Sequence, residues 1–373
     1  MSFLLTLIQA AGLGCASAAA GRRVMHYLQL ESYQLPGYIK SVKRNAMRAL
    51  IPPIAMAAVG VAALKVSGLF GLALLLEALT AALLAWQAAK EKAKKPFVAT
   101  ERVKRLTAVH AAVNTVLALI LLLISPTLGY LMPAFEPALL MLAAVVAAPM
   151  EKHIAGQFVK DAQARLAAQP NLIKIGITGS YGKTSTKFLL RDILSVKYNV
   201  LATPSSFNTT MGVTRVIREQ LTPAHQVFIA EMGARHVGDI RELVELVHPQ
   251  MGLITSVGPQ HLDTFGTIER VRDAKYELID GLPKDGTAIF ARDGAICEEL
   301  FDRCPLEKKY KPGMLVDAKD MACGPWGTRF TLVDIQTGEE ANCQTRLLGE
   351  HSISNLLLCC TAARALGMTL PEI

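Results

Sequence analysis

Apolar positions are concentrated in the first 150 residues of the chain. They form five long stretches separated by polar connections, at residues 3–20, 49–64, 69–86, 108–131 and 135–150. A transmembrane helix needs about 20 apolar residues, and the second and fifth stretches, although short, can span if the helices tilt and flanking lysines reach the interface. The pattern therefore predicts a multi-span membrane region over residues 1–150, with about five helices.

Lysine and arginine gather in two of the connections between these stretches. The first of these loops contains Arg22, Arg23, Lys40, Lys43, Arg44 and Arg48, and the second contains Lys90, Lys92, Lys94, Lys95, Arg102, Lys104 and Arg105. Because cytoplasmic loops carry the excess of basic residues, we expect the N-terminus outside and everything after Met150 in the cytosol. A four-span arrangement, in which the second and third stretches form a re-entrant hairpin, gives the same side.

Two alternatives remain open for this half. Residues 1–20 have the small-residue form of a signal-peptide cleavage site at Ala16-Ser17-Ala18, but no basic residue precedes Phe3. Glu77 and His110 are ionisable residues within the apolar stretches, and each marks either a functional polar site or a group that faces a neighbouring helix. An anchor, or a platform for a lipid substrate, fits this half better than a transporter does.

The pattern changes after a segment at residues 151–170 that we expect to be a linker. From residue 171 to 373, short apolar runs such as IKIGIT, VFIAEMG, GLITSV and TAIFA alternate with stretches of helical period. Strands that alternate with helices are typical of an α/β domain with a largely parallel sheet. The predicted fold is an α-helical membrane segment followed by an α/β P-loop domain with a largely parallel sheet.

The first predicted strand, IKIGIT, runs directly into a glycine-rich loop before a helix. The loop contains Thr178, Gly179, Ser180, Tyr181, Gly182, Lys183, Thr184 and Ser185. Glycines let backbone N–H groups and the helix N-terminus meet phosphates, while the lysine reaches the terminal phosphates and the threonine can hold Mg²⁺. The usual loop has a glycine at the position of Ile177. We predict ATP and Mg²⁺ as ligands, with a generic ATPase still open.

Two further side chains are expected at the same edge of the sheet. Glu231 ends the run VFIAE, and His261 follows the run GLITSVGPQ. Ligands of parallel sheets bind at the carboxyl ends of the strands, so both are candidate Mg²⁺ ligands, although Mg²⁺ prefers oxygen. Each also has an ordinary structural explanation: Glu231 as a helix cap or ion-pair partner, and His261 as a turn residue.

Charge and cysteine content exclude several classes of protein. The net charge is +8, but the basic residues flank apolar stretches and few aromatics lie among them, so we expect no nucleic-acid partner. Seven cysteines at irregular spacing contain no C-x-x-C pair, which argues against a disulfide framework or zinc ribbon.

Four motifs, TGSYGKTSTK, EMGARHVGDI, GPQHLDTFGTIERVRDAKYELIDGLP and LLGEHSISN, resemble the central ATP-binding domain of the Mur ligases. The resemblance covers roughly residues 170–373 and is closest to the type that adds D-alanyl-D-alanine to the peptidoglycan precursor. It implies an ATP-dependent carbon–nitrogen ligase that activates a carboxylate as an acyl phosphate. The implied partners are a UDP- or lipid-linked muropeptide and an amino acid or D-alanyl-D-alanine.

The resemblance also implies roles for individual residues. Lys183, His261 and Lys275 would be catalytic, and Thr184, Glu231, His261 and a carbamylated Lys275 would lie at metal. Asn208 and Thr209 would contact the acyl substrate, although the family has paired asparagines there. Asp293, His351 and Asn355 would contact the nucleotide, and Ala291 replaces an asparagine of the family pattern.

Two departures concern whole domains. The membrane segment occupies the position of the family's UDP-binding domain, which suggests a lipid-linked acyl acceptor and a multi-pass protein of the cell membrane with a cytoplasmic catalytic domain. The family's C-terminal ligase domain should start near residue 373, so we expect it to be missing from this sequence. Open alternatives are an amidating enzyme for a lipid-linked muropeptide or another acid, a P-loop transporter or sensor, and a non-catalytic membrane nucleotide-binding protein.

Overall fold

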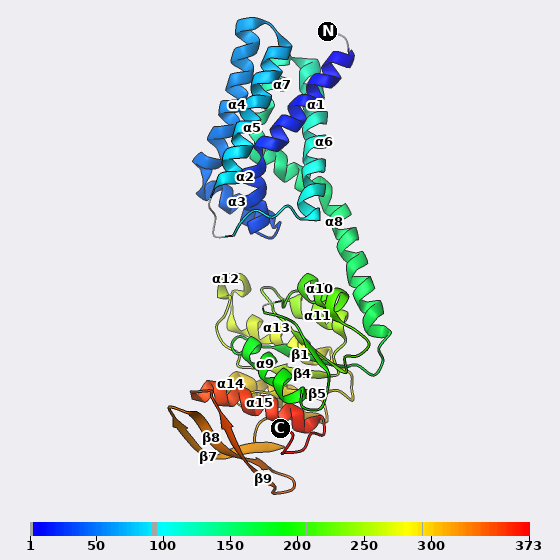
Figure 1. The fold of residues 1–373 in the computed structure, drawn as a ribbon, viewed down its shortest axis with the longest axis vertical. Coiled ribbons are helices and arrows are strands. Elements are labelled where there is room, and N and C mark those ends of the chain that lie inside the picture. Colours follow the sequence, from blue (N-terminus) through cyan, green and yellow to red (C-terminus); the bar gives the residue numbers. More distant parts are fainter. Residues whose placement is uncertain (1–2, 92–94, 206, 293) are drawn as a thin grey trace. The chain divides into compact units, whose positions relative to one another are not determined.

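The computed structural model describes residues 3–91, 95–205, 207–292 and 294–373 (Figure 1). The chain divides into two compact units, one ending at Ile154 and the other spanning Ala155–Ile373. Each unit has hydrophobic clusters of its own.

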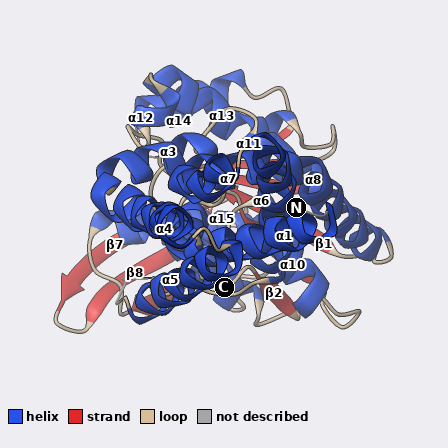
Figure 2. Ribbon diagram, turned by 90° about the horizontal axis from the view of Figure 1, so that it is seen from above, coloured by secondary structure: helices blue, strands red, loops and turns tan. Residues whose placement is uncertain are grey.

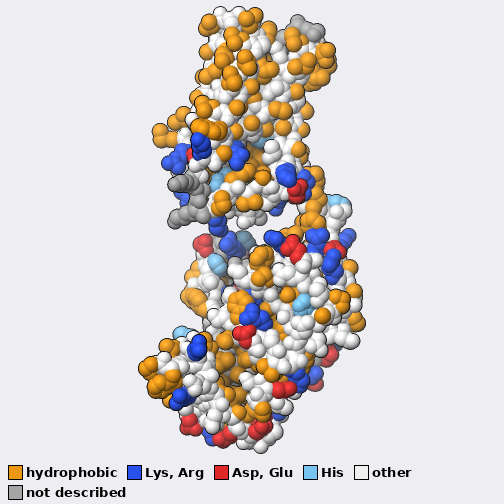
Figure 3. Space-filling model, viewed as in Figure 1, with side chains coloured by type: hydrophobic (Ala, Val, Ile, Leu, Met, Phe, Trp, Pro, Cys, Tyr) orange, Lys and Arg blue, Asp and Glu red, His pale blue; other side chains and the backbone are white. Residues whose placement is uncertain are grey.

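The N-terminal unit is built from helices. They are α1 (Phe3–Ala20), α2 (Arg22–Leu30), α3 (Leu35–Arg44), α4 (Ala46–Ser67), α5 (Phe70–Lys90), α6 (Glu101–Ile124), α7 (Pro126–Leu131), a 3₁₀ turn η1 (Met132–Phe135) and α8 (Glu136–Ala167), whose last turns belong to the second unit. Within the described residues, five helical segments are long and apolar enough to cross a membrane. Figure 3 shows hydrophobic side chains over the visible face of this unit and basic side chains gathered towards one end.

The helix boundaries differ from the predicted apolar stretches for local reasons. Helix α6 begins at Glu101, seven residues before the apolar run, because Thr100 caps it by accepting a hydrogen bond from Val103 N. It ends at Ile124 because Pro126 forces Ser125 into an extended conformation, with φ −159° and ψ 133°.

A buried polar cluster joins three helices of this unit. His110 Nε2 lies 3.0 Å from Glu136 Oε1, and Ser17 Oγ donates to the other oxygen of that carboxylate. Asn114 Nδ2 lies 3.2 Å from the same histidine nitrogen. All four side chains are at most 1% exposed. His110 therefore faces a neighbouring helix and is paired there. Glu77 is also buried, opposite Gly60, and its carboxylate has no hydrogen-bond partner among the described residues.

The second unit contains a six-stranded sheet with strand order β2-β3-β1-β4-β5-β6, in which every pair is parallel. The strands are β1 (Ile173–Thr178), β2 (Val200–Ala202), β3 (Val227–Glu231), β4 (Met251–Ile254), β5 (Thr287–Phe290) and β6 (Lys308–Tyr310). The predicted α/β fold with a parallel sheet is confirmed. In the register, Ile177 pairs with Glu231 and Thr178 pairs with Ile254, so β1, β3 and β4 end at the same edge.

Helices cover both faces of this sheet. They are α9 (Lys183–Leu194), α10 (Thr210–Gln220), α11 (Asp239–Val247), α12 (Leu262–Phe265), α13 (Ile268–Asp280), α14 (Ala295–Arg303) and α15 (Glu350–Ala365). Side chains alternate along β3: Phe228 and Ala230 join the core formed with α10, α11 and α13, whereas Val227 and Ile229 join the core formed with α9 and α15.

The end of α8 is part of the first of these cores. The segment 151–170 was expected to be a linker, but it is helical to Ala167, and Ala162 (0% exposed) and Leu166 (4% exposed) pack among residues of α10 and α11.

A second sheet, which the sequence did not predict, is antiparallel. It contains β7 (Val316–Gly324), β8 (Gly327–Asp334) and β9 (Glu340–Thr345), in that order. Figure 2 shows β7 and β8 to one side of β1 and β2. The inner residues Val316, Phe330 and Leu332 pack against Ile353 and Leu357 of α15. This packing against a helix stabilises a sheet of only three strands.

Candidate functional site

The edge where β1, β3 and β4 end is the place where the strand order reverses. Within the sheet, β2 and β3 lie on one side of β1, whereas β4, β5 and β6 lie on its other side. Crevices at such reversals bind ligands in open α/β sheets. The predicted loop follows the end of β1 at this edge, and Glu231 is the last residue of β3. The segment that leads to His261 follows the end of β4.

The glycine-rich loop connects β1 to α9, as predicted. Gly182, with φ +81°, is the residue before α9, and a Cβ there would lie 2.8 Å from Asn355 Nδ2 and Oδ1. The position requires glycine for its backbone angle and for the close approach of α15. The first turn of α9 leaves N–H groups without partners inside the helix, and a helix N-terminus that follows such a loop is suited to an anion.

The segment after β4 holds the loop in shape. Ser180 N donates to Ser256 O at 2.8 Å, and Ser180 Oγ donates to Gly258 O at 2.9 Å. Thr255 Oγ1 lies 2.6 Å from Tyr181 O and is fully buried. The role of Ser180 and Thr255 in shaping the loop was not visible in the sequence, because it depends on contacts 74 to 78 residues apart.

Lys183 bends back over the loop. Its Nζ donates to Gly179 O at 2.6 Å and to Ser180 O at 3.0 Å. Burial lowers the pKa of Lys183, and the carboxylate of Glu231 partly opposes that shift. The ammonium group therefore lies within the loop that phosphates would enter.

Glu231 is the centre of a hydrogen-bonded cluster. Thr184 Oγ1 donates to Glu231 Oε2 at 3.0 Å, Lys187 Nζ donates to the same oxygen at 2.9 Å, and Asn208 Nδ2 donates to Oε1 at 3.1 Å. The glutamate is 1% exposed and Lys187 is 0% exposed. Sequence reasoning missed Lys187, which lies one helical turn after Lys183, because that spacing does not distinguish a buried lysine from a solvated one.

These residues fit a magnesium ion. Mg²⁺ binds carboxylate and hydroxyl oxygens together with phosphate and water, and Thr184 and Glu231 bring such oxygens within 3.0 Å of each other beside the phosphate loop. No group of three or more His, Cys, Asp and Glu side chains forms a metal cage among the described residues. The geometry therefore suits a metal that arrives with phosphates.

Asn208 and Thr209 have different environments. The side-chain amide of Asn208 donates to Glu231, and the backbone carbonyl of Asn208 accepts a hydrogen bond from Gly233 N at 2.8 Å. Thr209 precedes α10, and its hydroxyl accepts a hydrogen bond from Gly212 N at 3.3 Å. Asn208 is thus part of the site, whereas the hydroxyl of Thr209 caps a helix.

Positive charges act on both His261 and Lys275, and Lys275 also lies near the carboxylates of Asp239 and Glu277. Slight desolvation at this exposed position lowers the pKa of His261, and the charges of Arg235 and Lys275 lower it further. Burial, reinforced by the charge of Lys183, lowers the pKa of Lys275 to about 8. His261 is exposed, with φ +56°, directly before α12. No hydrogen bond joins it to Glu231 in the described part of the chain.

Glu277 shapes the neighbouring loop. Its carboxylate accepts hydrogen bonds from Gly238 N at 2.7 Å and Arg241 N at 3.0 Å, and so caps α11 from α13. Since Lys275 lies two residues earlier on α13, one helix carries both the buried amine and the cap. The sequence did not suggest this role.

His351 and Asn355 lie at the far side of the loop. They line a pocket of about 290 Å³ together with Ser185, Phe188, Leu189, Asp192, Leu347 and Ser352. The pocket adjoins the start of α9 and is a candidate for the base of a nucleotide. Asp293, the other predicted nucleotide contact, lies outside the described residues.

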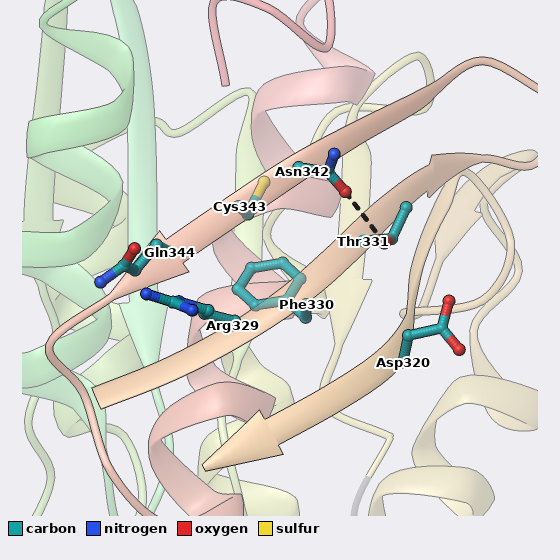
Figure 4. Close-up of a pocket in the computed structure, with 7 residues that line it drawn as sticks. All are labelled: Asp320, Arg329, Phe330, Thr331, Asn342, Cys343 and Gln344. Atoms are coloured by element: carbon teal, nitrogen blue, oxygen red, sulfur yellow. Dashed lines mark hydrogen bonds between the residues drawn. The ribbon is translucent and has the colours of Figure 1, made fainter. Parts of the chain in front are cut away.

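Another pocket, of about 390 Å³, lies on the antiparallel sheet (Figure 4). It is lined by Asp320, Arg329, Phe330, Thr331, Asn342, Cys343 and Gln344. None of the predicted site residues contributes to it.

Comparisons with known proteins identify relatives of the second unit. Residues 177–363, half of the chain, match the Mur ligase middle domain. The UDP-N-acetylmuramoyl-tripeptide–D-alanyl-D-alanine ligase of Synechocystis sp. is 34% identical over 194 residues, 52% of this chain and 41% of the relative. The enzyme of that name from Escherichia coli (strain K12) is 31% identical over 243 residues, 62% of this chain and 53% of the relative. The chain thus spans about half the length of these relatives.

Solved structures give the same answer for the fold. MurF from Acinetobacter baumannii aligns with a TM-score of 0.55 and 28% identity, over 58% of this chain and 48% of that protein. MurF ligase from Thermotoga maritima, solved in complex with ADP, aligns with a TM-score of 0.51 and 25% identity, over 58% of this chain and 50% of that protein.

Proposed function

This chain belongs to the Mur ligase family, and on that premise we propose that it is a membrane-anchored, MurF-like ligase that uses ATP to form an amide bond on a peptidoglycan precursor. In this reaction the γ-phosphoryl group of ATP moves to a substrate carboxylate, and the amine of the second substrate then displaces phosphate. By analogy with the names of the relatives, the acid is a muramoyl tripeptide and the amine is D-alanyl-D-alanine.

The observation that carries the proposal is the pairing of Thr184 with Glu231 beside Lys183. Phosphoryl transfer depends mainly on positioning and on neutralising charge. Lys183 supplies a cation inside the loop, and the hydroxyl and carboxylate, 3.0 Å apart, would hold Mg²⁺. The bound ion would supply further neutralisation of the phosphates. These groups support the proposal of an enzyme that transfers the γ-phosphoryl group of ATP.

The nucleotide base is assigned to the pocket of His351 and Asn355. Asn355 touches the loop at Gly182, so a base in this pocket and phosphates in the loop would belong to one molecule. The acyl substrate is assigned to the side of Asn208, whose carboxamide contacts Glu231.

Lys275 is proposed to carry a carbamate. Carbon dioxide adds to a neutral amine, forming an N–C bond with loss of a proton, and the product is an anion. A pKa of about 8 leaves a larger neutral fraction than the usual value of 10.5 does. The resulting anion would lie near the positive charge of Lys183 and the carboxylates of Asp239 and Glu277, and with His261 it would help to orient a second Mg²⁺.

The N-terminal unit is proposed to anchor the enzyme in the membrane, with the catalytic unit in the cytosol. Its five apolar helical segments support this placement. An enzyme held at the bilayer meets lipid-linked precursors at high local concentration, so a lipid-linked muropeptide is the alternative acid substrate. Resistance to carbonate extraction is expected for such a protein, and release by carbonate would contradict the anchor.

The catalytic proposal is tested with the full chain in phospholipid nanodiscs. ATP is supplied with D-alanyl-D-alanine and either the UDP-linked or the lipid-linked muramoyl tripeptide, and ADP and the condensed product are measured. We expect ADP formation that requires the tripeptide, and the preferred carrier identifies the substrate class. Lys183→Ala should abolish ADP formation, while Lys284→Ala, which changes an exposed lysine of the same unit, should not. ADP formation indifferent to the tripeptide would contradict the ligase assignment.

A further inference from the structure

Lys187 is a buried cation directly beside the proposed metal site. It lies on α9, one turn after Lys183, and is 0% exposed. Its Nζ donates to Glu231 Oε2 at 2.9 Å and to Ser205 O at 2.5 Å. Lysine side chains are almost never fully buried unless they are paired, so the contact with Glu231 accounts for its position.

Three donors from its own chain already reach the carboxylate of Glu231. Thr184 and Lys187 share Oε2, and Asn208 occupies Oε1. The negative charge of the glutamate is therefore compensated without a metal. Lys183, whose ammonium lies in the adjoining loop, adds a second positive charge near the same place.

This arrangement is unfavourable for a free divalent cation. A cation that approached Glu231 would meet one carboxylate and two ammonium groups, and no cluster of three acidic, cysteine or histidine ligands exists among the described residues to offset them. Charges a few ångströms apart at a partly buried site interact strongly, even with an effective dielectric constant of ~20. Nucleotide phosphates, which bring several negative charges, would reverse this balance.

We propose that Lys187 is an internal counter-ion of Glu231 that makes metal binding depend on nucleotide. Lys187 acts through Glu231 and is a positioning residue. Its second bond, to Ser205 O, ties the segment that leads to Asn208 to the same carboxylate. The inference rests on the proposed function, because it concerns the Mg²⁺ site assigned there.

The test measures Mg²⁺ binding to the full chain in detergent, by calorimetry, without nucleotide. Wild-type protein should show no saturable binding up to millimolar Mg²⁺, which places its dissociation constant above that range. Lys187→Gln keeps a hydrogen-bond donor and removes the charge, and its dissociation constant for Mg²⁺ should be at least about tenfold lower than that limit. The matched control Lys284→Gln removes an exposed positive charge from the same unit and should behave as wild type. Adding Glu231→Gln to Lys187→Gln should abolish the gained binding.

Several outcomes would overturn the inference. One is equal Mg²⁺ affinity in wild type and Lys187→Gln. Another, which needs no variant and remains available if Lys187→Gln does not fold, is wild-type Mg²⁺ binding that is as tight without ATP as with it. Binding of ATP to wild type is measured in parallel. Absence of ATP binding would contradict the proposed function, whereas normal ATP binding with unchanged metal affinity in Lys187→Gln would contradict this inference alone.

Discussion

Replacing Lys275 by methionine is expected to stabilise the catalytic unit at neutral pH while removing a residue of the proposed site. Lys275 is 2% exposed, and burial lowers its pKa from 10.5 to about 8. This difference corresponds to a destabilisation of about 3 kcal/mol at pH 7, since each pKa unit is worth about 1.36 kcal/mol. Methionine has a similar length and no charge, so Lys275→Met should recover most of that free energy.

The effect should depend on pH in a defined direction. The unfolded chain holds the lysine proton up to about pH 10.5, and the folded protein releases it near pH 8. Between these values the unfolded state binds more protons, so the stability of wild type rises with pH. The advantage of Lys275→Met is therefore fully present below pH 8 and shrinks as the pH approaches 10.5.

The assay is thermal unfolding of the full chain in detergent, in buffer free of carbon dioxide so that the amine stays unmodified. For a unit of this size, about 3 kcal/mol corresponds to a rise in melting temperature of roughly 6–12 °C at pH 7. The difference should be clearly smaller at pH 9.5. Lys284→Met, at an exposed position, serves as the control. A lower melting temperature for Lys275→Met at pH 7, or a gap independent of pH, would refute the reasoning.

Three further substitutions have expected outcomes. Glu277→Ala removes the acceptor of two backbone N–H groups at the start of α11 and should cost about 1–3 kcal/mol, measured by thermal unfolding; equal stability would disprove the cap. Gly182→Ala forces a side chain to φ +81° and should cost about 1–2 kcal/mol and weaken binding of a fluorescent ATP analogue, so unchanged binding would argue against the loop. Glu136→Ala, which leaves His110 without its carboxylate, should lower the melting temperature of the detergent-solubilised chain, whereas Leu142→Ala, at an exposed position of α8, should change it little.

The parts of the fold that follow local rules could be predicted from the sequence. The run IKIGIT, the glycines after it and Glu231 at the end of β3 have signals that depend on neighbouring residues alone. Lys187 could not be identified in this way, because a lysine four residues after another on a helix is equally typical of a solvated face. Its burial results from β3 and the segment around Ser205, which come from elsewhere in the chain.

The antiparallel sheet and the buried pair in the helical unit were missed for related reasons. β7 exposes most of its side chains, so its sequence has little alternation of apolar and polar residues, and its stability depends on α15. Glu136 is the second residue of the fifth predicted stretch, directly after Phe135, and nothing in the local sequence pairs it with His110, because only the fold brings the two together. Pairing across distant segments is a property of the packed structure.

The end of α8 has a practical consequence for work on the catalytic unit. Ala162 and Leu166 are buried members of the hydrophobic cluster that also contains Val216, Ile217 and Ile240 of α10 and α11. A recombinant fragment that starts at Leu172, one residue before β1, would expose these apolar side chains to solvent and should precipitate. Expression that starts at Ala155, by contrast, retains the covering turns and should yield a monodisperse protein for crystallisation and inhibitor screening.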